Sequence, residues 1–223
     1  MNSHLSVAQS AMKNSGSYSS LEQLAAKASF SEKRPQKPLP ILSRPIPKGK
    51  SEVSLSAFSF LFSEFIQYSL AKVNNITELE KRLSDCGYNI GVRMLELITY
   101  REKNYKRETK LINMLTFISY TVWRILFSKQ ADLLEKSTDQ DDEYMISENQ
   151  SLPITKFIST PREYSGLNCA SFVAGIVEGI LDAAEFGARV SAHSMPLEGQ
   201  KQMKTVILIK FNPDVIARSN LTA

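Results

Sequence analysis

The sequence predicts an α+β fold, a single domain in which helices pack on an antiparallel sheet of about four strands. After residue 50, three long segments with apolar residues at helical spacing come first. Two short β-prone runs, one more helical segment and two further β-prone runs follow. Of the 223 residues, 43% are hydrophobic and 22% are charged, a globular composition that excludes a fully disordered or fibrous chain. Two cysteines, Cys86 and Cys169, are too few for a disulfide-stapled secreted scaffold.

The first predicted helix covers residues 51–68 and has an unusually broad apolar face. Its stripe at helical spacing comprises Leu55, Phe58, Phe62 and Phe65, widened by Ala57, Leu61 and Tyr68. Phe60 and Ile66 fall outside this stripe, so the helix is apolar nearly all round and we expect it to be buried on several sides. The domain's own sheet, a partner protein or a lipid-filled cavity would each supply that cover.

Two more helices are predicted, over about residues 77–100 and 106–127. Their apolar stripes are Leu79, Leu83, Cys86, Ile90, Met94 and Leu97 in the first, and Leu111, Leu115, Ile118, Val122 and Ile125 in the second. A short acidic link over residues 137–143 then separates this helical half from the β-prone half of the domain.

The β-prone half begins with predicted strands at residues 143–147 and 154–158, which polar residues and Pro153 separate. A helix is predicted over residues 168–186, with Gly187 in the position of a helix-ending glycine. Strands at residues 189–194 and 204–211 follow. The last of these is nearly all apolar, which predicts a central place in the sheet.

The first 50 residues form a basic, Pro- and Ser-rich tail that we expect to be disordered or draped on the domain. Five of the nine prolines lie there, and eight Lys and Arg against two acidic residues give the tail a net charge of +6. The whole chain carries +4, so the remainder carries −2, which argues against a folded basic face for nucleic acid. The predicted boundaries are a tail over 1–50, a domain over 51–218 and a C-terminal tail over 219–223. The basic tail is also a candidate for peripheral contact with anionic membranes.

A cysteine hydrolase is the sharpest enzymatic hypothesis. Cys169 begins a predicted helix, where the positive end of the helix dipole would lower the pKa of its thiol, and His193 follows on a predicted strand. Burial of Cys169 as a small core residue is the favoured interpretation, because no group that would orient His193 is evident. Walker A, GxGxxG, HExxH and GxSxG motifs are absent, and two histidines are too few to suggest a zinc site. We therefore assign no catalytic, cofactor-binding or metal-binding residue.

Glycines at i and i+4 occur twice in predicted helices, as Gly87 with Gly91 and as Gly175 with Gly179. Each costs about 1 kcal/mol relative to alanine in a helix interior, which is tolerated where another segment must approach closely. Close packing within the chain is the favoured interpretation, and a contact with another molecule is the alternative. The candidate partner interface comprises Phe58, Leu61, Phe62, Phe65, Gly87 and Gly91. With its apolar helix face uncovered, the purified chain is expected to be poorly soluble or to self-associate.

Six segments of the domain carry recognisable motifs. They are residues 41–73, Gly87–Arg93, Arg107–Lys110, Asp142–Ile146, Asn168–Ile176 and Thr205–Phe211. In this order, over about residues 41–218, they resemble the small-subunit family of the TRAPP vesicle-tethering complex. A match in this order is more specific than any one motif.

The resemblance implies helices on a twisted antiparallel sheet, in agreement with the element order. Members of this family pair through helices as heterodimers and assemble into an elongated core. By resemblance, that core tethers vesicles and acts as a guanine nucleotide exchange factor for a Rab-type GTPase in ER-to-Golgi transport. The chain would be a non-enzymatic structural link that needs no cofactor and contacts the acylated small subunit and another small subunit. It would be cytoplasmic, and peripheral at endoplasmic reticulum and Golgi membranes.

One position departs from the acylated member of the family. The acylated cysteine lies four residues before the arginine of an Arg-Glu-Thr motif, and counting back from Arg107 gives Lys103 here. Acylation at that position is therefore not implied. Cys169 lies in the family's Asn-Cys pattern, which is not a catalytic motif there. Two alternatives stay open: a cysteine hydrolase that uses Cys169 and His193, and a stand-alone lipid-binding module.

Overall fold

The structure is a computed structural model that describes residues 53–102, 107–138, 140–164, 166–196 and 203–221. The chain divides into two units, Met1–Lys48 and Gly49–Ala223, and every described residue belongs to the second. The tail predicted over residues 1–50 lies outside the described residues, and so does Lys103.

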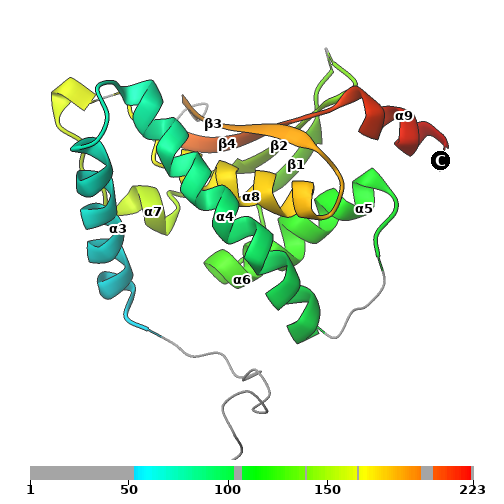
Figure 1. Cartoon of the computed structure of the whole chain (residues 1–223), viewed down its shortest axis with the longest axis horizontal. Coiled ribbons are helices and arrows are strands. Elements are labelled where there is room, and N and C mark those ends of the chain that lie inside the picture. Colours follow the sequence, from blue (N-terminus) through cyan, green and yellow to red (C-terminus); the bar gives the residue numbers. More distant parts are fainter. Residues whose placement is uncertain (1–52, 103–106, 139, 165, 197–202, 222–223) are drawn as a thin grey trace, which may run out of the picture. The chain divides into compact units, whose positions relative to one another are not determined.

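A helical first half precedes a half that mixes strands and helices, as the sequence predicts (Figure 1). The first half contains α3 (Leu55–Leu70), α4 (Ile76–Glu102), α5 (Leu111–Thr116), the π-helical segment η2 (Phe117–Val122) and α6 (Trp123–Phe127). The second half contains β1 (Leu133–Lys136), β2 (Glu143–Glu148), α7 (Pro153–Lys156), η3 (Arg162–Tyr164), α8 (Ser171–Ala183), β3 (Ala188–Pro196), β4 (Met203–Phe211) and α9 (Pro213–Leu221). The predicted α+β fold class is confirmed.

The sheet has four described strands in the order β1-β2-β4-β3, and each neighbouring pair is antiparallel. β4 lies between β2 and β3, which confirms its predicted central position. Its buried residues are Thr205, Val206, Ile207, Ile209 and Phe211. Ile207 lies opposite Ile146 of β2 and Ala192 of β3, so apolar side chains form a row across the sheet.

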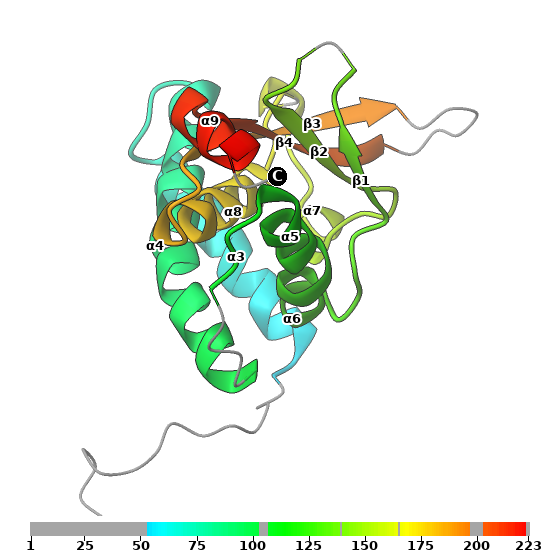
Figure 2. The same cartoon turned by 90° about the vertical axis from the view of Figure 1, so that its right-hand side faces the viewer.

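Helix α8 is the centre of the core. It packs against α4 on one side and against β3 on another (Figure 1). Nine of its 13 residues are buried, because its sequence is apolar on nearly every face. In both views α4 runs alongside α8, and α5 and α6 lie on the far side of the core (Figures 1 and 2).

The third predicted helix is one continuous helical rod with a π-helical middle, and it begins at Leu111 rather than at residue 106. A π-helix winds with i→i+5 hydrogen bonds and therefore shifts the following side chains around the axis. Ile118, Val122 and Trp123 all become fully buried, although a regular helix would spread them more widely. The rod ends at Ser128, whose φ of 61° is left-handed.

One predicted strand is wrong, and β1, η3 and α9 were not predicted. Residues 154–158 were expected to form a strand, but α7 places a single helical turn at Pro153–Lys156, with the proline at a favourable first position. The fourth strand is instead β1, at Leu133–Lys136. Helix α9 was not predicted, and it extends past residue 218 to Leu221.

Candidate functional site

Three of the four candidate interface residues on α3 belong to an aromatic cluster inside the domain. The ring of Phe62 stacks near that of Phe58, with centroids 6.1 Å apart, and meets Phe172 of α8 edge-on at 5.3 Å. Phe65 lies 6.3 Å from both Phe62 and Phe172. Phe62 is 4% exposed, and Phe58 and Phe65 are half-buried. The cluster holds α3 against the rest of the domain.

The opposite face of α3 is uncovered and mostly apolar, with the exposed Glu64 in its middle. Leu61 is 70% exposed and Phe60 76% exposed, and Tyr68 is also exposed. Residues 57, 61, 64 and 68 follow the spacing that one helix presents to another. Figure 1 shows α3 at one side of the domain, with α4 and α7 on its inner side. Among the described residues, none covers Phe60 or Leu61.

The candidate interface residues Gly87 and Gly91 lie elsewhere, between α4 and α8. A Cβ atom on Gly87 would stand 2.1 Å from the carbonyl oxygen of Phe172, and one on Gly91 would stand 2.2 Å from that of Ile176. The reverse also holds for the glycines of α8. A Cβ atom on Gly175 would stand 2.0 Å from the carbonyl oxygen of Ser84, and one on Gly179 would stand 2.3 Å from that of Tyr88.

The two glycine pairs therefore interlock, and they bring the backbones of α4 and α8 into direct contact. This confirms the interpretation of close packing within the chain. The face of α4 that carries Gly87 and Gly91 is occupied by α8 of the same chain. Of the six candidate residues, Leu61 is the one exposed on the surface, and its role in a partner interface stays a prediction.

The structure leaves Cys169 without the properties of a nucleophile. Cys169 is 4% exposed, and burial, helped by the nearby Glu80 carboxylate, raises its pKa to about 11. The expectation of a lowered pKa is wrong, because burial disfavours the thiolate and α8 begins only at Ser171, two residues after Cys169. His193 is exposed on β3, where its Nε2 hydrogen-bonds the Ser191 hydroxyl at 2.9 Å. Asn168 caps the backbone N–H of Ala170 at 3.0 Å and orients no histidine.

We expect Cys169 to resist alkylation at neutral pH. With a pKa of about 11, the thiolate fraction at pH 7 is about 10⁻⁴, and the thiol is also inaccessible. Cys86, which is half-buried, should react faster. Iodoacetamide labelling followed by peptide mass spectrometry measures both rates, with the urea-unfolded chain as control. Faster labelling of Cys169 than of Cys86 in the folded chain would revive the hydrolase hypothesis.

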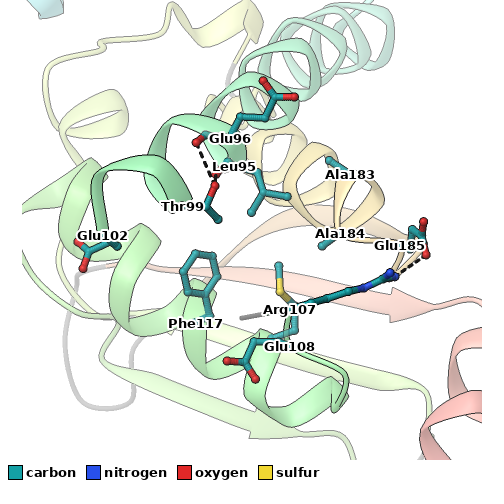
Figure 3. Close-up of a pocket in the computed structure, with 11 residues that line it drawn as sticks. Leu95, Glu96, Thr99, Glu102, Arg107, Glu108, Phe117, Ala183, Ala184 and Glu185 are labelled. Atoms are coloured by element: carbon teal, nitrogen blue, oxygen red, sulfur yellow. Dashed lines mark hydrogen bonds and ion pairs between the residues drawn. The ribbon is translucent and has the colours of Figure 1, made fainter. Parts of the chain in front are cut away.

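A pocket of about 490 Å³ opens where α4 and α8 end (Figure 3). Its apolar lining comprises Leu95, Met114, Phe117, Ala183 and Ala184. Four glutamates stand around it, Glu96, Glu102, Glu108 and Glu185, and one of them, Glu185, is paired with Arg107. The negative balance of these side chains repels the carboxylate of a free fatty acid. The pocket therefore does not favour the lipid-binding alternative.

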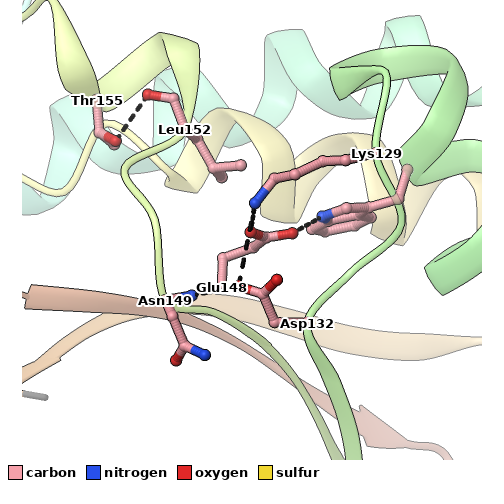
Figure 4. A network of polar contacts seen from close by, with 7 residues as sticks. Lys129, Asp132, Glu148, Asn149, Leu152 and Thr155 are labelled. Atoms are coloured by element: carbon pink, nitrogen blue, oxygen red, sulfur yellow. Dashed lines mark hydrogen bonds and ion pairs between the residues drawn. The ribbon is translucent and has the colours of Figure 1, made fainter.

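Glu148, at the end of β2, anchors a buried polar network that no sequence pattern indicated (Figure 4). The indole Nε1 of Trp123 donates a hydrogen bond to Oε1 of Glu148 at 2.6 Å, and the ammonium of Lys129 pairs with Oε2. Burial raises the pKa of Glu148, against the opposing effects of Lys129 and Trp123. Asp132 accepts a hydrogen bond from the N–H of Asn149 at 2.8 Å. These contacts join α6 and the residues that follow it to the sheet.

Within the described part of the chain, no helix is both long and apolar enough to cross a membrane. The same residues contain no group of three or more His, Cys, Asp or Glu side chains arranged to hold a metal ion.

Comparison with known proteins gives one consistent family. Residues 58–212 match the family model of the transport protein particle (TRAPP) component. The chain is 60% identical over 182 residues to trafficking protein particle complex subunit 5 of Dictyostelium discoideum, covering 82% of this chain and 97% of that protein. It is 43% identical over 178 residues to subunit 5 of Homo sapiens, covering 80% and 90%. Subunit 31 of Saccharomyces cerevisiae is 32% identical over 233 aligned positions, covering 77% and 80%.

The fold also matches a solved structure. It is a crystal structure of trafficking protein particle complex subunit 3 from Naegleria fowleri, covalently bound to palmitic acid. The TM-score is 0.59 and the sequence identity is 16%, covering 70% of this chain and 95% of that one. At this identity the likeness concerns the fold alone.

Proposed function

Because this chain belongs to the TRAPP component family and is similar over most of its length to proteins named subunit 5, we propose that it is a structural subunit that links other small subunits of the complex. The acylated small subunit is one expected neighbour. The assembled core tethers vesicles and promotes nucleotide exchange on a Rab-type GTPase in ER-to-Golgi transport, at the cytoplasmic side of these membranes. The chain itself carries out no reaction.

The outward face of α3 is the observation that supports this proposal. The helix is fixed from within by the aromatic cluster, so its outer residues Phe60, Leu61 and Tyr68 stand on a rigid support. Removing large apolar side chains from water is the main favourable term in stable association. A helix of a neighbouring small subunit that packs along residues 57, 61, 64 and 68 would bury this face.

The rigidity of the support comes from the interlocked helices. Phe172 of α8 holds the α3 cluster, and α8 is itself fixed against α4 by the four glycines. A linking subunit gains from such a core, because a preformed face loses little conformational freedom on binding. Exchange activity belongs to the assembled complex in this proposal, and the isolated chain is expected to have none.

The double variant Phe60→Ser, Leu61→Ser tests the role of α3. Burial of a Phe or Leu side chain contributes about 1.5–3 kcal/mol, so loss of both should weaken assembly by about 100-fold or more. Both side chains are exposed, so the domain should stay folded. The measurement is titration of the full chain with its purified small-subunit partners, followed by size-exclusion chromatography.

The matched control is Ile112→Ser, which removes a comparably exposed apolar side chain from α5. It should assemble like the unaltered chain. If the α3 double variant assembled as tightly as this control, α3 would not be the linking surface.

A further inference from the structure

The outer edge of β3 has unused backbone hydrogen-bonding groups. β3 is the last strand in the sheet order, and β4 pairs with it along one side only. The backbone N–H of Val190 does not point to β4, since it donates to the carboxylate of Glu178 at 2.9 Å. In an antiparallel pair, successive residues turn their N–H and C=O groups to alternate sides. Ala192 and Ser194 therefore point theirs outward, where no described residue bonds their N–H groups.

A groove of about 1150 Å³ runs along this edge. One wall is the β3 edge from Val190 to Ser194, the opposite wall is the first half of α4, and α8 contributes Ser171, Ala174 and Glu178 between them. Figure 1 shows α4, α8 and β3 in this arrangement. Neighbouring strands need a spacing of only about 4.8 Å, so the groove suits one extended chain beside β3. The facing wall of α4 makes edge-to-edge pairing with another whole sheet unfavourable.

Among the charged side chains that line the groove, acidic ones outnumber basic ones. Glu78, Glu80, Asp85 and Glu178 line it, against the two bases Lys81 and Arg189. Three of these carboxylates accept backbone hydrogen bonds within the chain: Glu78 from Asn74, Glu80 from Asn168 and Glu178 from Val190. The net charge of −2 favours a segment that carries Lys or Arg.

We propose that the β3 edge receives a short, extended, basic segment of a partner protein as an added fifth strand. The N–H and C=O groups of Ala192 and Ser194 supply the backbone hydrogen bonds, and the acidic groove supplies the preference for Lys and Arg. The carboxylate of Glu178 already accepts the outward N–H of Val190, so the added strand can pair only beyond this residue. This surface is separate from the outward face of α3, so the proposal for one surface can be wrong while the proposal for the other is right.

A defined peptide tests the proposal. The probe is a nine-residue acetylated and amidated peptide in which lysine alternates with valine and threonine, added to the full chain. Hydrogen exchange followed by NMR should slow at least tenfold at the amides of Ala192 and Ser194. Replacing the lysines by glutamate should weaken binding at least tenfold. A peptide with N-methyl groups on alternate amides, which cannot pair with a strand edge, should not bind.

Variants of Ala192 locate the contact. Ala192→Pro removes an outward N–H that β4 does not use, so the strand should survive while peptide protection is lost. Ala192→Val retains the N–H and should retain binding. The proposal is overturned if no peptide slows exchange at these amides, or if the glutamate or N-methylated peptide protects them equally. It is also overturned if protection appears without peptide and rises with protein concentration, which would assign the edge to a second copy of the chain. The N-methylated peptide keeps the test valid even if the proline variant does not fold.

Discussion

The variant Gly175→Ala is expected to lose at least about 4 kcal/mol of folding free energy, a large part of the total stability of a domain. The added Cβ atom would stand 2.0 Å from the carbonyl oxygen of Ser84 on α4. That oxygen belongs to a helix backbone, so no side-chain rotation can relieve the overlap. α8 cannot move away either, because it is held between α4 and β3.

Gly166→Ala is the matched control for this prediction. A Cβ atom there would meet only the Cδ1 atom of Ile76, at 3.9 Å, which is an ordinary contact. This variant should change stability by less than about 1 kcal/mol. Urea unfolding followed by the fluorescence of Trp123, the single tryptophan of the chain, measures both variants. Equal unfolding midpoints for the two would contradict the interlocked packing of α4 and α8.

Two substitutions of Glu148 are expected to differ sharply in stability. Glu148→Ala removes the acceptor of the Trp123 indole N–H, leaves Lys129 without its buried partner and opens a small cavity, so we expect a loss of about 2–4 kcal/mol. Glu148→Gln keeps an oxygen for the indole N–H and removes the cost of burying a charge. It should lie within about 1 kcal/mol of the unaltered chain at pH 7.

The pH dependence of stability separates the charge of Glu148 from its hydrogen bonds. Burial raises its pKa in the folded state, so this group favours folding most at pH values below its unfolded pKa. That contribution is lost as the pH rises through the folded pKa. The difference in unfolding free energy between Glu148→Gln and the unaltered chain should therefore shift in favour of the glutamine variant from pH 4 to pH 8. If Glu148→Ala and Glu148→Gln were equally stable at every pH, the network would not stabilise the fold.

Much of the fold was predictable, because the long helices and the central strand have strong local patterns. The apolar spacing located α3, α4 and α8 to within a few residues, and the run Thr205–Phe211 identified the central strand. Glycines at i and i+4 indicated a close approach, and the structure places α8 of the same chain there. These features depend on residues near one another in the sequence, so they can be recognised without the tertiary fold.

Short elements were less predictable. The run Ile154–Ile158 is rich in β-prone residues, yet Pro153 starts a single helical turn there. β1 has only four residues and is mostly exposed, so its sequence lacks an apolar alternation to detect. Glu148, Trp123 and Lys129 meet although they are 19 or 25 residues apart, a separation that matches no helix or strand period.

The sequence by itself determined the α+β class, the order of the main elements and the family, because periodicity and ordered motifs can be recognised from the sequence alone. Only the tertiary structure decided which apolar residues stay outside. Leu61 and Phe62 are adjacent and both strongly apolar, yet Leu61 is 70% exposed and Phe62 is 4% exposed. The same holds for Cys169, whose pKa rises because α8 is buried rather than solvated at its start. Burial depends on which distant segments come into contact in the fold, and a local sequence pattern does not show which segments those are.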